Sequence, residues 1–290
     1  MPAAPPCPKG RVDHCPVPGY RKTLIGSPVP GRLEGMGSRG YDSMTFSPIG
    51  AACGLCITFA AAASGVQAQE QAMDASLPSP VVLELYTSQG CSSCPPADAL
   101  LAELTGDPGL IPLALHVDYW DYIGWADNFA NPHYTERQKA YARAAGSRMI
   151  YTPQMIVAGT RQVEGNDPEA VASAIAEARR TQSGIALKVV RQGDGLHVRA
   201  EAAPGSGPLK LQLVRYKPEA TIDIAHGENA GRSVTYRNIV TEWQAVADWP
   251  GTPPLDMVLP APGDAPAVVL LQGAAPLGGP GAIVAAARVE

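Results

Sequence analysis

The hydrophobic pattern of the chain changes near residues 181–184. Before this point, short apolar runs that are typical of buried strands alternate with segments in which apolar residues recur at helical spacing. The order is β-α-β-α-β-β-α within residues 80–182. This order predicts a parallel βαβ unit that is closed by an antiparallel hairpin and a covering helix. The expected strands are 81–87, 110–118, 155–158 and 160–163, and the expected helices are 97–104, 134–145 and one that begins at Pro168.

After this point the chain reads as short alternating runs, such as LHVRAEA and LKLQLVRY, separated by the turns QGDG and PGSGP. Strands at this spacing are typical of a small antiparallel sandwich. We therefore expect an α/β domain over 80–182, followed by an all-β, sandwich-like domain over 183–290. Nothing in the second domain suggests catalytic chemistry.

The N-terminal part predicts export. Residues 49–65 form an apolar run that is shorter than the roughly 20 residues of a membrane span, and a small-x-small pattern follows it. This layout predicts a signal peptide that is cleaved after Ala68; the alternative is an uncleaved anchor. The Pro/Gly-rich residues before Met36 do not belong to a normal signal, so Met36 is the expected start within the upstream segment 1–68. Residues 69–79 would form a linker.

Composition narrows the class of protein. The 290 residues carry a mild formal charge of −5, and 46 % of them are hydrophobic, so the chain can bury a sizeable core. Without a run of Lys or Arg, we expect no nucleic-acid partner. We expect the exported form, periplasmic or secreted, to have no membrane association.

Export also changes the meaning of the cysteines. Four of the six lie upstream of the predicted cleavage, which leaves Cys91 and Cys94 in the stretch YTSQGCSSC. In an oxidising compartment we expect these two to form a disulfide. The pair can be read as a redox pair, a small structural staple or half of a metal site.

The stretch YTSQGCSSC at a strand–helix junction, followed by the segment YTPQ at 151–154, resembles the thioredoxin-like superfamily. The resemblance implies a CxxC pair at a helix N-terminus that faces a cis-proline, and these positions match Cys91, Cys94 and Pro153. The strings HVDYWDYIGWAD and HGENAGR also resemble an uncharacterised family of secreted proteins with a thioredoxin-like domain. That resemblance covers 80–290 and implies a fold but no activity.

The chemistry of the pair supports a redox role, because a thiolate is the working nucleophile and a helix N-terminus favours it. Two features depart from thioredoxins. Gly90 stands where thioredoxins usually have tryptophan, and Pro95 and Pro96 remove two N–H donors next to the pair. The prolines fit best if Ser93 is the N-cap of the helix.

The other two readings remain open. In the chain-entropy model, a four-residue disulfide loop contributes only roughly 2 kcal/mol, which makes it a weak staple. Zinc needs four ligands, commonly two CxxC pairs, and the exported form has no second pair. His116 and His133 could join the cysteines, but His116 falls in an alternating strand, where a packed or surface residue is expected. We therefore expect neither a metal nor another cofactor.

Glu84 is a candidate proton acceptor for Cys94, because it interrupts the apolar run VVLELYT seven residues before Cys91. The alternative is a carboxylate at a sheet edge or one paired with a cation.

Aromatic residues gather at 118–131 in a chain that is only 6 % aromatic. This segment is expected at the strand edge that bears the cysteines. Trp120, Tyr122 and Trp125 could form a binding wall there, together with Thr152; the alternative is a satellite core that packs under a loop.

These features predict an exported thiol–disulfide oxidoreductase that acts on protein thiols or disulfides and exchanges electrons with a redox partner protein. Cys91 would attack or be attacked, Cys94 would resolve the mixed disulfide, and Thr152 with Pro153 would hold the substrate strand. The alternative is a non-catalytic binding protein on the same scaffold, with a structural disulfide. Exposure of the cysteines distinguishes these two functions, because an oxidoreductase needs one accessible sulfur, whereas a binding protein can bury both.

Overall fold

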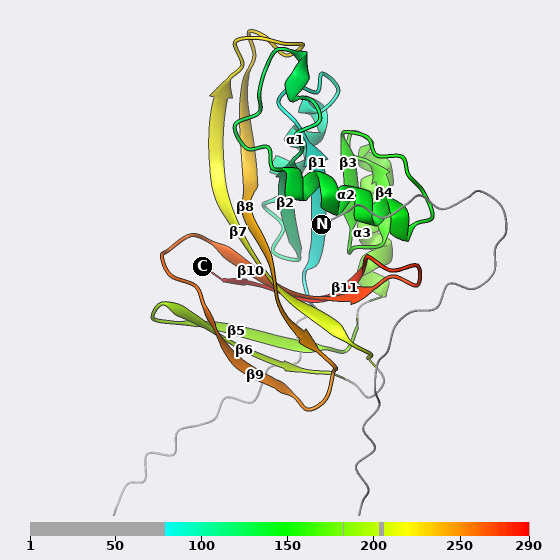
Figure 1. Cartoon of the computed structure of the whole chain (residues 1–290), viewed down its shortest axis with the longest axis vertical. Helices are drawn as coiled ribbons and strands as arrows, with labels where there is room; N and C mark the ends of the chain where they lie inside the picture. Colours follow the sequence, from blue (N-terminus) through cyan, green and yellow to red (C-terminus); the bar gives the residue numbers. More distant parts are fainter. Residues whose placement is uncertain (1–78, 182, 203–205, 290) are drawn as a thin grey trace, which may run out of the picture. The chain divides into compact units, whose positions relative to one another are not determined.

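A computed structural model describes residues 79–181, 183–202 and 206–289 (Figure 1). The predicted signal peptide, its cleavage after Ala68, the start at Met36 and the linker up to residue 78 lie outside these ranges. None of the helices within them is long and apolar enough to cross a membrane.

The first part of the chain contains its helices, in the element order that the sequence predicts (Figure 1). β1 lies parallel to the next strand, β2, and antiparallel to β3, which forms a hairpin with β4. The elements are β1 (Val81–Thr87), α1 (Pro95–Leu104), β2 (Leu110–His116), the 3-10 turn η1 (Asp121–Ile123), α2 (Pro132–Ala144), β3 (Gln154–Val157), β4 (Arg161–Glu164) and α3 (Pro168–Arg180).

The start of α1 differs by one residue from the sequence prediction. Cys94, not Ser93, is the N-cap, and Pro95 and Pro96 occupy the first two helical positions. Proline has a fixed φ and no N–H, so it fits where the helix leaves its donors unpaired. The Cys94 carbonyl then accepts the first helical hydrogen bond from Asp98. Cys91 lies outside the helix, as expected.

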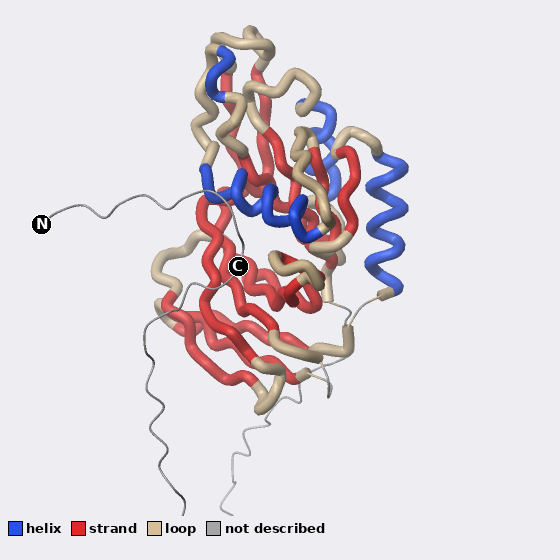
Figure 2. Tube along the Cα trace, turned by 45° about the vertical axis from the view of Figure 1, so that its right-hand side comes forward, coloured by secondary structure: helices blue, strands red, loops and turns tan. Residues whose placement is uncertain are grey.

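Beyond residue 183 the described residues contain only strands and loops (Figure 2). The strands are β5 (Ala186–Gln192), β6 (Gly195–Glu201), β7 (Leu209–Asp223), β8 (Ser233–Trp249), β9 (Leu255–Pro260), β10 (Ala267–Ala274) and β11 (Pro280–Val289).

The sheet of the first part continues into these strands. Its order is β11-β10-β7-β8-β2-β1-β3-β4, and β8 joins β2 in parallel through Ala114 and Ile239. The sequence indicates two domains with a boundary at 182/183; α3 ends at Arg180, and the sheet continues across the boundary. The crossing depends on the length of β7 and β8, which have 15 and 17 residues.

Asn238 marks the place where β8 meets β2. Its φ of +48° lies in the left-handed region, which Asn tolerates better than most residues. Its side-chain amide donates to the carbonyl of Pro112 in β2 over 2.8 Å. This bond continues the contact between the two strands beyond the Ala114–Ile239 pair.

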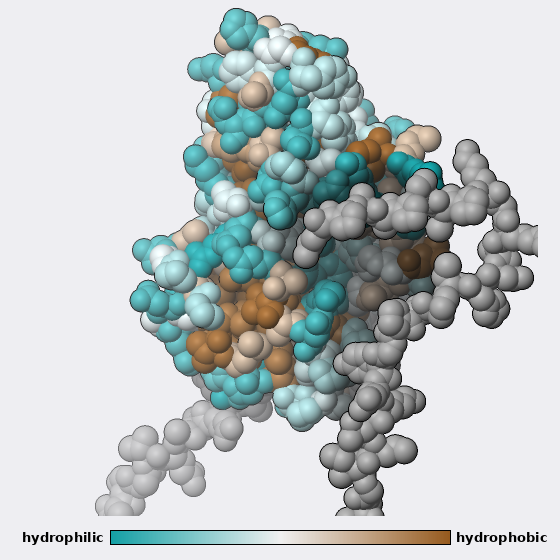
Figure 3. Space-filling view, in the orientation of Figure 1, coloured by the Kyte–Doolittle hydropathy of each residue, from teal (hydrophilic) through white to brown (hydrophobic). Residues whose placement is uncertain are grey.

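A second sheet, β5-β6-β9, packs against β7, β10 and β11 of the first. Alternation along β6 explains this packing: Leu196, Val198 and Ala200 are buried between the sheets, while the residues between them face outward. On the outward face Val190 and Val258 are exposed, and Figure 3 shows an apolar area over these strands. In this part of the chain the two sheets form a two-layer β structure.

β1 is buried on both faces, which explains its nearly continuous apolar sequence. Leu83 and Leu85 belong to a core cluster with residues of α1 and α3. Val82 and Tyr86 belong to a second cluster, which includes residues of α2. Glu84 has the same parity as Val82 and Tyr86, so it faces α2.

Arg137 of α2 meets this buried carboxylate. Its Nε and Nη2 donate to the two oxygens of Glu84 over 2.7 and 2.9 Å, and Tyr86 and Tyr141 donate to the same oxygens. Burial alone would lower the pKa of the guanidinium, but the adjacent Glu84 charge raises it above its ordinary value. Glu84 is therefore paired with a cation inside the core, and all its recorded bonds lie on the α2 side of the sheet.

We expect Glu84→Gln to lower the free energy of unfolding by roughly 3 kcal/mol, because it leaves the largely buried Arg137 charge uncompensated. Glu136→Gln is the control, since its bond to Lys139 joins two exposed side chains on α2 and should contribute less than about 1 kcal/mol. Urea denaturation of both variants measures the difference. Similar losses in the two variants would contradict a structural role for Glu84.

Candidate functional site

Cys91 and Cys94 form a disulfide at the carboxyl end of β1 and the N-terminus of α1. Their Cα atoms are 5.4 Å apart. Both residues are 0 % exposed, whereas Ser92 and Ser93 between them are exposed. The disulfide is therefore present as expected, but neither sulfur is open to solvent in this structure.

The Thr152–Pro153 peptide lies beside the pair. This bond is cis, as the resemblance to thioredoxin-like proteins implies for Pro153. The Ser93 hydroxyl donates to the carbonyl of Thr152 over 3.5 Å, and Trp120 Nε1 donates to the Thr152 hydroxyl over 2.7 Å. Thr152 and Pro153 are thus placed next to the loop between the cysteines.

The aromatic segment packs around the same loop. A Cβ at Gly90 would lie 3.2 Å from Cβ of Trp120, so the close approach of Trp120 explains glycine at this position. Trp125 Nε1 donates to the side chain of Gln89 over 2.8 Å. Tyr122, in contrast, is 82 % exposed, and no contact of its side chain with the pair is recorded in the described residues. Of the predicted binding wall, Trp120 and Trp125 therefore border the site.

The loop that joins β7 to β8 covers the pair from the other side. We call residues 224–232 the cover loop. Within it, the buried Asn229 donates through Nδ2 to the carbonyls of Gln89 and Cys91 over 2.9 and 2.8 Å. Gly227 lies against Trp125, since a Cβ there would be 3.3 Å from the Trp125 Cβ. In Figure 1 the β7–β8 hairpin reaches the same end of the molecule as the segment after β2.

Buried polar groups lie behind the disulfide. His116 of β2 places Nδ1 2.7 Å from Oδ2 of Asp127, and both side chains are fully buried. The backbone N–H of Gln89 donates to the same Asp127 oxygen over 2.8 Å. Thr87 is the register partner of His116 on β1. These contacts connect the end of β1, the end of β2 and the aromatic segment.

Buried side-chain atoms without a hydrogen-bond partner gather at this same place. Within the described residues they are Thr87 Oγ1, Gln89 Nε2, Asp98 Oδ2, His116 Nε2 and Asn229 Oδ1. Each such atom costs roughly 1–3 kcal/mol, and apolar packing would be sufficient for a passive staple. A group of them beside a disulfide is typical of a functional site.

Asp98 is the ionisable group closest in sequence to the pair. It lies one helical turn after Cys94, so the two residues share a face of α1. Burial raises the pKa of its carboxyl to about 7; the charge of His116 acts to lower it, and that of Asp127 acts to raise it. Near neutral pH this group can therefore take up or release a proton.

The sequence pointed to Glu84 as the acid behind the pair; in the structure Glu84 is paired with Arg137, and Asp98 is the buried acid in the first turn of the helix that Cys94 caps. A signal for Asp98 was present, because this aspartate interrupts the apolar face of the helix ADALLAEL at the i+4 position from Cys94. Asp127 and Asn229 carry no local signal. They reach the site only through the fold, although the string HGENAGR, which includes Asn229, contributes to the family resemblance.

The structure does not assemble a metal site from the cysteines and histidines. His116 is engaged with Asp127, and His133 lies in the first turn of α2. Among the described residues, no group of three or more His, Cys, Asp or Glu side chains has the spacing of metal ligands.

Comparisons with known proteins identify one family and two similar solved structures. Residues 82–272 match a family described as "Protein of unknown function (DUF1223)". The crystal structure of protein AGR_C_4864 from Agrobacterium tumefaciens is 33 % identical, with a TM-score of 0.65 over 73 % of this chain and 95 % of that one. HBP35 of Porphyromonas gingivalis shares the fold at 15 % identity, with a TM-score of 0.52 over 74 % of this chain and 76 % of that one. No curated protein matches.

The raised pKa of Asp98 predicts a pH-dependent stability. A carboxyl whose pKa is about 7 in the folded protein, against an ordinary 3.8, stabilises fully below about pH 4, and this contribution is lost as the pH rises to about 7. Relative to Asp98→Asn, the wild-type protein should lose at most about 4 kcal/mol over this range, at about 1.36 kcal/mol for each pKa unit.

Urea unfolding of the oxidised proteins between pH 4 and 8 measures this difference. Asp264→Asn removes an exposed carboxylate and serves as the control, which should follow the wild-type curve. If Asp98→Asn also followed the wild-type curve, Asp98 would not carry a shifted proton.

Proposed function

The chain belongs to the DUF1223 family, whose function is unknown, and from its site we propose that it is an exported thiol–disulfide oxidoreductase on a thioredoxin-like domain. The observation that carries this proposal is the group of buried, incompletely hydrogen-bonded polar side chains behind Cys91–Cys94. A reaction that moves protons at the sulfurs needs such groups, whereas a structural disulfide does not.

The proposed reaction is a two-step exchange with protein thiols. A substrate thiolate attacks Sγ of Cys91; a substrate–Cys91 disulfide forms, the Cys91–Cys94 bond breaks, and Cys94 leaves as a thiolate. A second substrate thiolate then attacks the substrate sulfur and releases Cys91 as a thiolate. The substrate loses two electrons and becomes a disulfide, and the pair becomes a dithiol. A partner protein with its own disulfide would reoxidise it; the reverse sequence reduces a substrate disulfide.

Asp98 supplies the proton that the leaving sulfur needs. When Cys94 departs as a thiolate, the adjacent carboxyl can protonate it, and in the reverse direction the carboxylate can accept the proton of the Cys94 thiol. A pKa of about 7 makes both directions accessible near neutral pH. The buried His116–Asp127 pair lies next to Asp98 and influences its charge state.

Thr152 and Pro153 would position the substrate strand. They lie beside the exposed Ser92 and Ser93, which form the only part of the CxxC loop open to solvent in the described structure. An extended peptide there could pair with the backbone of Thr152, and Trp120 fixes the Thr152 side chain from behind.

The burial of both sulfurs supports a second candidate, a binding protein with a structural disulfide. Under that reading the exposed Tyr122 and the outer surface of the cover loop would contact the partner. Under the oxidoreductase reading the cover loop must move before a thiolate reaches Cys91. The two candidates therefore differ in how the disulfide reacts.

We expect a reduction potential between about −120 and −270 mV, the range of working oxidoreductases. The measurement is equilibration of residues 69–290 with glutathione or dithiothreitol buffers. A potential below about −300 mV with slow exchange would identify a structural disulfide, and the binding candidate would take precedence.

A trapping experiment complements the potential. Cys94→Ala leaves Cys91 without its resolving thiol, so mixed disulfides with a thiol-containing test protein should accumulate. Cys91→Ala is the matched control and should form few, because Cys94 is the N-cap of α1 behind the loop. Equal trapping by the two variants would contradict the assignment of Cys91 as the attacked sulfur.

We expect Asn229→Ala to speed the reduction of the disulfide by dithiothreitol by up to roughly 30-fold, because the cover loop loses two hydrogen bonds of about 1 kcal/mol each. Asn128→Ala removes an exposed asparagine from the segment on the other side of the site and should leave the rate unchanged. An unchanged rate in Asn229→Ala would show that the cover loop does not limit access.

A further inference from the structure

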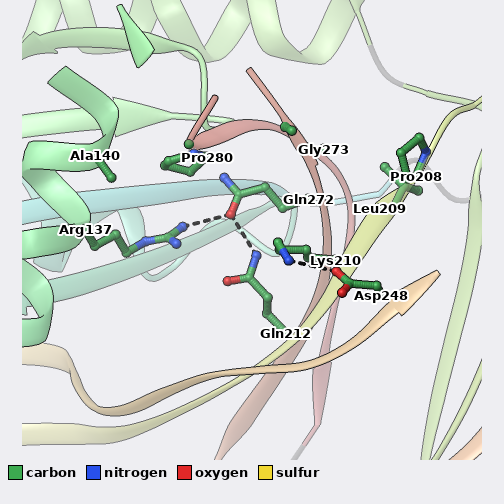
Figure 4. A pocket seen from close by; sticks show the side chains of 12 residues that line it. Arg137, Ala140, Pro208, Leu209, Lys210, Gln212, Asp248, Gln272, Gly273 and Pro280 are labelled. Carbon is green, nitrogen blue, oxygen red and sulfur yellow. Dashed lines mark hydrogen bonds and ion pairs between the residues drawn. The ribbon is translucent and has the colours of Figure 1, made fainter. Parts of the chain in front are cut away.

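A hollow in the protein surface lies apart from the residues of the disulfide site, and the proposed redox reaction does not use it. It is a pocket of about 560 Å³ between α2 and the strands β7, β10 and β11 (Figure 4). This volume lies within the range of sites that hold small organic molecules. None of the residues assigned to the disulfide site lines it.

The floor of the pocket is polar and comes from three elements. Arg137 of α2, Gln212 of β7 and Gln272 of β10 line it, and both glutamines are at least 95 % buried. Gln272 Oε1 accepts from Arg137 Nη2 over 3.1 Å and from Gln212 Nε2 over 2.8 Å (Figure 4). The two hydrogens of Gln272 Nε2 are used as well, by Tyr141 and the carbonyl of Gly281.

The polar groups on this floor that still have a free hydrogen-bonding position are donors. Among the described residues, Arg137 Nη1 has no recorded partner, while its Nε and Nη2 are engaged. Gln212 Nε2 carries a second hydrogen beyond the one given to Gln272, and its Oε1 already accepts from Trp243. A guanidinium and an amide nitrogen can only donate. A ligand that reaches the floor must therefore offer acceptor oxygens.

Two cationic side chains line the pocket, and each has an anionic partner: Glu84 for Arg137 and Asp248 for Lys210. Lys210 and Asp248 form an ion pair, but both are largely exposed, with side-chain exposures of 59 % and 80 %. Such a pair is weak, so the Lys210 ammonium can turn toward a bound anion.

The walls are apolar. Ala140, Pro208, Leu209 and Pro280 are among the lining residues, and Figure 4 shows them around the polar floor. A ligand with a hydrocarbon body would bury apolar surface against them.

We propose that this pocket binds a small organic acid, with its carboxylate on the Arg137 and Gln212 donors and its apolar body along the Ala140 and Leu209 walls. The site is independent of the cysteine pair, so the fate of the redox proposal does not decide it.

Isothermal titration of the oxidised protein, residues 69–290, with octanoate tests the site. We expect saturable binding with one site per chain. Octylamine has the same apolar body with a cation and should not bind, and 1-octanol should bind at least about 10-fold more weakly, because it lacks the charge-assisted bonds. Absence of saturable octanoate binding, or equal binding of octanoate and 1-octanol, would overturn the proposal.

Substitutions in the pocket lining test where octanoate binds, and they leave the buried Arg137 unchanged. Ala140→Leu fills the wall and should weaken octanoate binding about 10-fold or more by taking the space of the ligand body. Ala145→Leu makes the same change at an exposed position at the end of α2 and should have no effect. Lys210→Gln should weaken binding about 2- to 5-fold. Unchanged binding in Ala140→Leu would place octanoate elsewhere and contradict the assignment.

Discussion

The buried pair of Glu84 and Arg137 holds together the strands of the first part and those of the second. Glu84 belongs to β1 and Arg137 to α2, and the guanidinium also bonds to Gln272 of β10 and lies 3.8 Å from the ring of Trp243 on β8. Burying two charges is favourable only when their remaining hydrogen bonds are satisfied. Tyr86, Tyr141 and Gln272 provide them here for both Glu84 oxygens and for Arg137 Nη2, and this requirement fixes α2 against strands from both parts.

The continuous sheet explains how residues far apart in sequence share one site. β7 and β8 are long enough to pack in the two-layer β structure at one end and to run beside β2 at the other. Their connecting loop therefore reaches the carboxyl ends of β1 and β2, where Asn229 bonds to Cys91, 138 residues away in the chain. A separate second domain would leave the disulfide uncovered, so access to the sulfurs is a property of the whole sheet.

The local parts of this arrangement were predictable from sequence. The periodicity of 81–180 predicted the element order, and the resemblance to thioredoxin-like proteins implied the cis-proline at Pro153. The start of α1 was wrong by one residue, because a Ser N-cap competes with proline at the first helical position, and proline has the stronger constraint. The pairing of β2 with β8 rests on a short contact between distant segments. Hydrophobic periodicity does not predict which distant strands pair, so the sequence did not predict that one sheet includes strands from both parts.

The two buried carboxylates show why burial alone does not identify a functional acid. Glu84 and Asp98 both interrupt apolar segments, and both are almost completely buried. Glu84 receives bonds from a guanidinium and two phenols, so its charge is compensated and its role is structural. Asp98 has no cationic side chain bonded to it and keeps one oxygen without a partner. Burial therefore raises the pKa of its carboxyl to about 7, even though the charge of His116 acts to lower it. The difference lies in the partners, because only Glu84 is hydrogen-bonded to a cationic side chain. An acid that is left incompletely paired beside a disulfide can exchange a proton with a sulfur, and this is the property that the proposed reaction requires.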